Sequence, residues 1–201
     1  RAHEKAALFD AFTRGTDATV PLPAGDSPVP RYAHVVARGT YLPDRQVLID
    51  NMTHAERAGY RVLTPLLRTD GSLVLVDRGW VPLVDGARTR LPDVSVGSEP
   101  REVSGRADDP PRAGIAVSGP LGAGWPRVLG FPTIAQLEQV LGRPVYPRIV
   151  LLDADRPDGY VRAWRPPGMP PERHVGYAVQ WFGLALALVI IYVVVNLKKS
   201  S

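Results

Sequence analysis

The chain contains no cysteine and only two methionines among its 201 residues. The missing cysteine excludes disulfides, thiolate metal sites and redox-active thiols. With so little sulfur, the chain also lacks the soft ligands that a copper carrier would use. The 24 Lys and Arg residues are dispersed and form no basic stripe interleaved with aromatics, so nothing supports nucleic-acid binding. The net charge of +4 suits anionic lipid headgroups better.

Catalytic signatures are missing as well. The sequence contains no Gly-x-Ser-x-Gly elbow, no His-Glu-x-x-His pair and no Gly-x-x-x-x-Gly-Lys phosphate loop. His54 and Glu56 could suggest a metal site, but no further ligands are near in sequence, and a solvated turn is the better interpretation. Because no nucleophile and base stand at a usable spacing, we expect a protein that is not an enzyme.

One long apolar segment lies near the C-terminal end. From Tyr177 to Leu197 there are 21 residues without a formal charge, which as a helix would extend roughly 30 Å, the thickness of a bilayer core. We expect a transmembrane helix over residues 172–197 and a tail at 198–201. Because the first residue is Arg1 rather than Met, we also expect a membrane helix or signal upstream, in a longer protein.

The rest of the chain predicts one domain with a core of its own. Residues 1–14 have apolar positions at helical spacing and predict a short helix, whereas residues 15–30 contain four prolines and predict an extended linker. Residues 31–171 predict the domain itself. Its expected fold class is α+β, a mainly antiparallel β-sheet or barrel-like domain with short helices.

Within this domain, alternating apolar residues indicate a series of strands. The strongest signal is a hairpin of residues 59–67 and 73–80, joined by Asp70 and Gly71. A helix is expected at 132–141, which has Pro132 in its first turn and Gly142 after its end. Further strands are expected at 31–42, 45–51, 99–107 and 145–153. Two stretches rich in Gly and Pro, 110–131 and 155–171, predict loops.

His174 lies where the expected membrane helix begins. The positive end of a helix dipole would hold its imidazole neutral, which is the form that ligates metals. Such an imidazole could ligate a haem iron while Arg173 or Arg165 contacts the haem propionates. The alternative is an interfacial histidine that bonds a backbone carbonyl or a lipid phosphate. Spacing alone leaves both interpretations open.

The expected membrane helix also has one distinct face. Gly176, Gln180, Gly183 and Ala187 fall on a single stripe, and the pair Gly183 and Ala187 has the spacing at which small residues let a second helix approach. A helix partner and a generic lipid-facing helix both fit this pattern.

Trp80 follows Arg78 and Gly79 at the end of a predicted strand. Gly79 could allow a bulge that turns Trp80 outward toward a partner, or Trp80 could fill the core of the sheet. Both interpretations are kept.

Five stretches together resemble a known family. They are residues 38–41, 46–51, 59–66, 74–82 and 174–182, and they include an Arg-Gly-Trp-Val-Pro block and a His-x-x-Tyr-Ala-x-Gln-Trp-Phe block. In this order they resemble the Surfeit-locus-protein-one family of cytochrome c oxidase assembly factors. Arg1 and Lys5 match the Arg-x-x-x-Lys that follows the family's first membrane helix.

The resemblance implies a topology and a function. Two membrane helices would flank one domain on the outer face of a bacterial plasma membrane, with the C-terminus in the cytoplasm. Family members are thought to assist delivery of haem a to the catalytic subunit of cytochrome c oxidase, and His174 matches the histidine proposed to bind it. Expected partners are therefore the oxidase subunits, the lipid bilayer and other respiratory complexes. The alternative is an accessory subunit that stabilises the oxidase or a respiratory supercomplex without binding haem.

Overall fold

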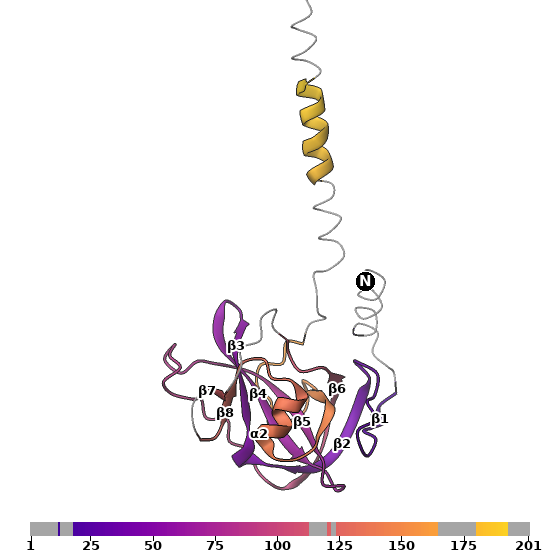
Figure 1. Ribbon diagram of the computed structural model, residues 1–201, viewed down its shortest axis with the longest axis vertical. Helices are drawn as coiled ribbons and strands as arrows, with labels where there is room; N and C mark the ends of the chain where they lie inside the picture. The colour runs from indigo at the N-terminus through magenta and orange to yellow at the C-terminus, as the bar shows by residue number, and fades with distance from the viewer. Residues whose placement is uncertain (1–11, 13–17, 113–119, 122–123, 165–179, 193–201) are drawn as a thin grey trace, which may run out of the picture. The chain divides into compact units, whose positions relative to one another are not determined.

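The computed structural model describes residue 12 and residues 18–112, 120–121, 124–164 and 180–192 (Figure 1). The chain divides into two compact units. One is Ala11–Arg165, and the other combines Arg1–Asp10 with Pro166–Ser201. The strands labelled in Figure 1 all belong to the first unit.

Most strands form close to their expected positions. In chain order the elements of the first unit are β1 (Val20–Pro21), β2 (His34–Tyr41), the 3-10 turn η1 (Pro43–Arg45), β3 (Val47–His54), β4 (Arg57–Leu67), β5 (Leu73–Pro82), β6 (Pro100–Asp108), β7 (Pro120–Leu121), β8 (Arg127–Leu129), α2 (Ile134–Leu141) and β9 (Val145–Leu152). The predicted α+β class, with a mainly antiparallel sheet and a short helix, is confirmed.

The hairpin of β4 and β5 forms as its turn sequence predicts. The backbone N–H of Arg68 donates to the carbonyl of Ser72 at 3.0 Å, which closes the turn. Asp70 Oδ1 accepts the N–H of Ser72 at 3.0 Å and its hydroxyl at 2.6 Å. These hydrogen bonds lower the pKa of Asp70 and fix the register of the two strands.

The helix α2 is capped at both ends. The Thr133 hydroxyl accepts a hydrogen bond from the N–H of Gln136, and Gln136 Oε1 accepts one from the N–H of Thr133. Together the two bonds form a capping box. Gly142 is the C-cap, as the sequence indicates. Leu137 is the buried residue of the helix and packs into the core.

Five strands close into a ring. The sheet order is β1-β2-β6-β9-β5-β4-β3-β8-β7, and a further pairing of β2 with β4 joins the two sides. The closure occurs where Thr40 and Tyr41 pair with Leu67 and Leu66. A Cβ at Gly39 would lie 2.3 Å from the carbonyl oxygen of Leu67, so glycine is needed for this close approach.

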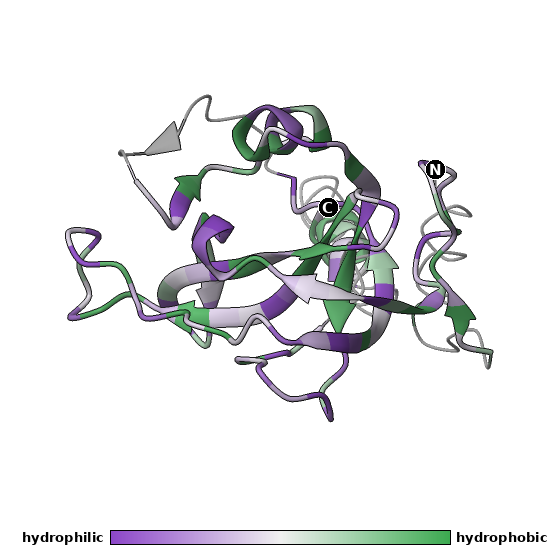
Figure 2. Cartoon of the chain, turned by 90° about the horizontal axis from the view of Figure 1, so that it is seen from below, coloured by the Kyte–Doolittle hydropathy of each residue, from purple (hydrophilic) through white to green (hydrophobic). Residues whose placement is uncertain are grey.

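The interior of the ring is apolar. One core cluster draws on all five ring strands, as shown by Val35, Leu66, Val74, Val103 and Val150. A second cluster includes Leu137 of α2 together with residues of β3, β4, β5, β8 and β9, so it covers another face of the sheet. In Figure 2, hydrophobic residues lie along one side of the short helix and on the strands.

Three parallel pairings and two short elements depart from the sequence prediction. β5 runs parallel to β9, β3 parallel to β8, and β1 parallel to β2. The predicted linker at 15–30 therefore contributes an edge strand, where Pro21 needs no ladder hydrogen bond on its open side. The stretch 110–131, predicted as a loop, contains β8, which pairs with the edge of β3.

Residues 180–192 of the second unit are helical, and their side chains are exposed. Among the described residues, no helix combines the length and hydropathy needed to cross a bilayer. The predicted transmembrane helix at 172–197 extends beyond the described residues at both ends and remains a prediction. The helix expected at 1–14 also lies outside them, apart from Phe12.

Candidate functional site

The Arg78-Gly79-Trp80 motif forms a β-bulge in β5. Arg61 pairs with Trp80 and Leu63 with Asp77, so Arg78 and Gly79 together face the single residue between them on β4. Gly79 has φ +112°, a conformation that L side chains rarely adopt. Its N–H donates to Asp77 Oδ1 at 3.0 Å, which stabilises the bulge.

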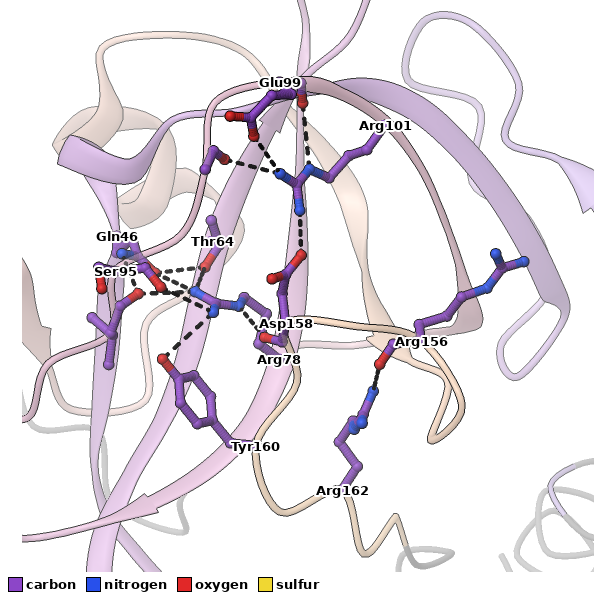
Figure 3. A network of polar contacts seen from close by, with 12 residues as sticks. Gln46, Thr64, Arg78, Ser95, Glu99, Arg101, Arg156, Asp158, Tyr160 and Arg162 are labelled. Carbon is purple, nitrogen blue, oxygen red and sulfur yellow. Dashed lines mark hydrogen bonds and ion pairs between the residues drawn. The ribbon is translucent and has the colours of Figure 1, made fainter.

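The bulge directs the Arg78 side chain into a network of neutral acceptors (Figure 3). Arg78 is only 2% exposed. Its acceptors are Gln46 Oε1 at 3.0 Å, Thr64 Oγ1 at 3.4 Å, the carbonyls of Val94 at 3.0 Å, Ser95 at 3.4 Å and Asp158 at 2.6 Å, and the Tyr160 hydroxyl at 3.4 Å. The guanidinium also lies 4.9 Å from the centre of the Tyr160 ring. Arg78 thus ties two loops, around Ser95 and around Asp158, to the sheet.

A second arginine extends this network. Arg101 pairs with the carboxylate of Asp158, and its guanidinium lies 4.7 Å from the centre of the Tyr41 ring. Burial raises the pKa of the Tyr41 phenol to about 12, so the ring stays neutral beside these cations. Figure 3 shows that the Asp158 loop is held from both sides by Arg78 and Arg101.

Trp80 is buried rather than turned outward. Trp80 is 9% exposed, and its indole N–H donates to the Met52 carbonyl at 3.1 Å. The His54 ring packs at 5.3 Å between centroids. On the main chain, Trp80 and Val161 form an isolated bridge. This placement agrees with the core interpretation of Trp80, although one side of the residue lines a cavity.

The cavity beside Trp80 has a volume of about 550 Å³. We call it the Trp80 pocket. Its lining comes from the β3–β4 hairpin, from β4, β5, β6 and β9, and from the end of the first unit: Met52, Thr53, His54, Ala55, Arg61, Trp80, Asp108, Leu151, Ala163 and Trp164. Pockets of this size accept small molecules or a few side chains.

Arg61, one partner of a buried ion pair, lies in the wall of the Trp80 pocket. Asp77 is fully buried, and its carboxylate pairs with the Arg61 guanidinium. Burial raises the pKa of the Asp77 carboxyl, and Arg61 and the Gly79 N–H oppose that rise only in part. The Arg61 guanidinium also lies 4.9 Å from the centre of the Trp164 ring. The indole N–H of Trp164 donates to the Leu152 carbonyl at 2.9 Å, which fixes this residue against the sheet.

The structure describes only some of the predicted site residues. His174, Arg173, Arg165 and Gly176 lie outside the described residues, so the predicted haem and propionate contacts stay predictions. Gln180, Gly183 and Ala187 are exposed on the helix at 180–192, where their spacing places them on one face. A Cβ at Gly183 would meet nothing within 4 Å.

Sequence reasoning missed a cluster at the start of β2. His34 contacts Asp153 Oδ2 through Nε2 at 2.8 Å and Thr19 Oγ1 through Nδ1 at 2.7 Å. The Ser104 hydroxyl also donates to Asp153 Oδ2 at 2.6 Å, and Arg156 donates to Ser104. These residues are far apart in sequence, so no spacing rule could have found them. The cluster joins the N-terminal edge of the sheet to the end of β9.

Metal binding finds no support in the part of the chain that the structure describes. No group of three or more His, Cys, Asp or Glu residues there could hold a metal ion. His54 ends β3, and Ala55 and Glu56, which both have positive φ angles, form the turn that leads into β4. The turn predicted at this position is confirmed.

A small closed β domain, followed in the chain by an apolar helix, is the architecture that these observations define. The model of the SURF1 family matches residues 1–186, and the chain belongs to that family. The chain is also similar to uncharacterized SURF1-like proteins of Mycobacterium bovis and Mycobacterium tuberculosis, each 29% identical over 168 residues. Each match covers 82% of this chain but 60% of the relative, so the chain spans about three fifths of the length of these curated relatives.

Proposed function

We propose that this protein is a membrane-tethered assembly factor for haem–copper cytochrome c oxidase and that it is not an enzyme. The observation that carries the proposal is the SURF1 family match over residues 1–186, which includes the whole β domain and part of the apolar segment. The closed sheet supports it, because a rigid domain with tied-down loops is suited to holding a partner surface. Its first expected partner is the catalytic subunit of the oxidase.

The finer proposal is that the protein assists delivery of haem a. His174 would ligate the iron, with Arg173 or Arg165 near the propionates. The bound haem would be the molecule that is delivered, not a catalytic cofactor of this protein. All three residues of this proposed haem site lie outside the described part of the chain.

The test is the haem a content of purified protein from cells that make haem a. We expect the His174→Ala protein to lose haem a that the unsubstituted protein retains. Asn196→Ala, at the other end of the same apolar segment, is the control and should retain it. Equal haem a in all three proteins would remove His174 from the proposed role.

A second candidate function is that of an accessory subunit without a cofactor. It is favoured by the exposed apolar helix at 180–192, where Trp181 is 70% and Phe182 76% exposed. Such a helix has surface to bury against another membrane protein. Recovery of this chain in a fixed ratio with mature oxidase, and without haem of its own, would support this function over the first.

The proposed location is the bacterial plasma membrane, with the β domain on the outer side and the C-terminus in the cytoplasm. Reporter fusions test this. An alkaline phosphatase fused after Ser201 should be inactive, whereas a green fluorescent protein at the same position should fluoresce. Active phosphatase would overturn the proposed orientation.

A further inference from the structure

Both indole N–H groups of the Trp80 pocket already donate a hydrogen bond. Trp80 donates its N–H to the Met52 carbonyl and Trp164 donates its N–H to the Leu152 carbonyl. Each ring is therefore held in place by a backbone group and contributes only its apolar surface to the pocket. Rigid aromatic walls of this kind favour a flat, apolar or conjugated ligand.

Arg61 supplies a positive charge to the lining of the pocket. Its side chain is 18% exposed, and one terminal nitrogen pairs with Asp77. A guanidinium carries five N–H donors, more than one carboxylate takes up. A carboxylate brought into the pocket would therefore lie beside a cationic side chain that is suited to it.

The other polar groups of the pocket also favour an acceptor. Thr53 and His54 lie on the same hairpin and carry a hydroxyl and an imidazole. The acid in the lining, Asp108, is already bound by Arg31 at 2.6 Å. An anionic ligand would therefore meet an acid whose charge is compensated, together with groups that can donate hydrogen bonds.

We propose that the Trp80 pocket binds a planar conjugated molecule that carries a carboxylate, with the plane against the indoles and the carboxylate toward Arg61. The lining residues that the structure describes all belong to the β domain. The inference rests on the proposed function only in the choice of a porphyrin as the probe. It adds to that function binding residues other than His174.

The test uses the full chain in detergent and metal-free protoporphyrin IX, a planar dicarboxylate. Without iron, ligation by His174 contributes nothing, and the variants below identify the part of the remaining binding that depends on the pocket. Binding is followed by porphyrin fluorescence and by quenching of tryptophan emission. Ala163→Phe fills the pocket from its lining, and Ala154→Phe, an exposed alanine on the same loop outside the lining, is the matched control.

We expect Ala163→Phe to weaken binding at least tenfold, roughly 1.4 kcal/mol, and Ala154→Phe to leave it unchanged. The dimethyl ester of the porphyrin, which has no carboxylate, should bind the unsubstituted protein about tenfold more weakly as well. Equal binding by the two phenylalanine variants, as simple partition into detergent would give, overturns the proposal.

Arg61 is tested with its charge partner. Replacing Arg61 alone would leave Asp77 buried without a counter-ion, so the double variant Arg61→Gln, Asp77→Asn is used. Its unfolding midpoint verifies that it folds. We expect the double variant to bind the acid and the ester equally, since the group that distinguishes them is gone. A persistent preference for the acid would overturn the role of Arg61.

The outcomes separate this inference from the proposed function. Loss of haem a in His174→Ala, combined with equal porphyrin binding by Ala163→Phe and Ala154→Phe, would keep the proposed function and reject the pocket. The pattern expected for the porphyrin, combined with unchanged haem a in His174→Ala, would keep the pocket and reject His174.

Discussion

Arg78 illustrates how one residue can organise a fold without a carboxylate beside it. Its guanidinium is almost fully buried, and its partners in the described structure are an amide, two hydroxyls and three carbonyls. Gln46, Thr64 and Val94 are themselves buried, and the other three partners lie on loops. The planar fork of arginine fits such a set, because its donors point in several fixed directions.

Replacing Arg78 by Lys should therefore destabilise the domain although the charge is kept. One ammonium cannot reach all the acceptors, and several would remain buried and unsatisfied. We expect a loss of about 2–4 kcal/mol in the free energy of unfolding, measured by chemical denaturation. Arg38→Lys is the control, since the Arg38 side chain is 82% exposed and pairs only at the surface. A loss below that of the control would contradict the structural role of Arg78.

Asp77 predicts a pH dependence of stability. Burial raises its pKa above the ordinary value of 3.8, so the folded protein keeps a proton that the unfolded chain has already released. Its contribution to stability is fully present below the ordinary pKa and is lost as the pH rises through the folded pKa. The difference in unfolding free energy between the unsubstituted protein and Asp77→Asn should thus fall as the pH rises from about 4.

The control for Asp77 is an exposed acid with the opposite behaviour. Hydrogen bonds from Ser95 lower the pKa of Asp93, so its contribution is lost as the pH falls instead. We therefore measure, across the same pH series, the difference in unfolding free energy between the unsubstituted protein and each of Asp77→Asn and Asp93→Asn. Plotted against pH, the two differences should have slopes of opposite sign. Slopes of the same sign would contradict the assignment for Asp77.

At the scale of elements, the bulge in β5 determines where Trp80 and Arg78 point. A Cβ at Gly79 would lie 2.7 Å from the Val161 carbonyl oxygen, at a φ that only glycine adopts readily. Because Trp80 also bridges to Val161, the bulge, the Trp80 pocket and the loop after β9 depend on the same backbone geometry.

Gly79→Ala should disturb all three at once. We expect it to lower the free energy of unfolding by about 2–4 kcal/mol, because strain and a backbone clash act together, and to shift the tryptophan emission of the folded protein. Gly25→Ala separates the two effects. Gly25 has φ +74° and open space around it, so strain alone should cost about 1 kcal/mol. Similar losses in both variants would show that the clash at Gly79 is relieved.

Local patterns predicted the individual elements because their causes are local. The Asp70-Gly71 turn and the Thr133 and Gly142 caps act within a few residues, and so the β4–β5 hairpin and α2 could be read from sequence. β8 was missed because residues 127–129 form a strand only by pairing with β3, far away in the chain. Likewise, no local pattern shows that β5 and β9 are neighbours.

The candidate site could be predicted only where a motif marked it. The Arg78-Gly79-Trp80 block drew attention to the bulge, but Arg61 was read only as part of an alternating strand. Asp77 offered a signal that was overlooked: a single acid inside the apolar run of β5 needs a buried partner, and the facing strand carries Arg61. The contribution of Trp164 could not be foreseen, because the irregular segment after β9 that brings it to the sheet has no local pattern that points to Arg61.

At the scale of the whole molecule, closure of the ring depends on a short contact between β2 and β4. Gly39→Ala would place a methyl group against the Leu67 carbonyl and push the two strands apart. We expect a loss of about 2–4 kcal/mol in unfolding free energy and faster amide exchange at Thr40 and Tyr41. Arg38→Ala, an exposed neighbour on β2, should change stability by less than about 0.5 kcal/mol. Unchanged exchange in Gly39→Ala would contradict the closure.

Under the proposed function, the helix at 180–192 is the surface at which the protein would meet an oxidase subunit. Gly183→Leu would add a bulky side chain to the face formed by Gln180, Gly183 and Ala187, and close approach of another helix would be blocked. We expect recovery of oxidase with the purified protein to fall at least fivefold, which corresponds to a loss of about 1 kcal/mol in binding free energy. Ala185→Leu, on another side of the helix, should leave recovery unchanged. Equal recovery with both variants would favour the lipid-facing interpretation.

The parallel pairing of β5 with β9 also has a consequence for biosynthesis. β5 ends at Pro82 and β9 begins at Val145, so at 5–20 residues per second the ribosome needs about 3–13 s to supply the second neighbour of β5. During that interval β5 is an open edge with a nearly continuous run of residues destined for the interior. A nascent chain that stalls between these two strands therefore exposes an edge that is prone to aggregation until β9 follows.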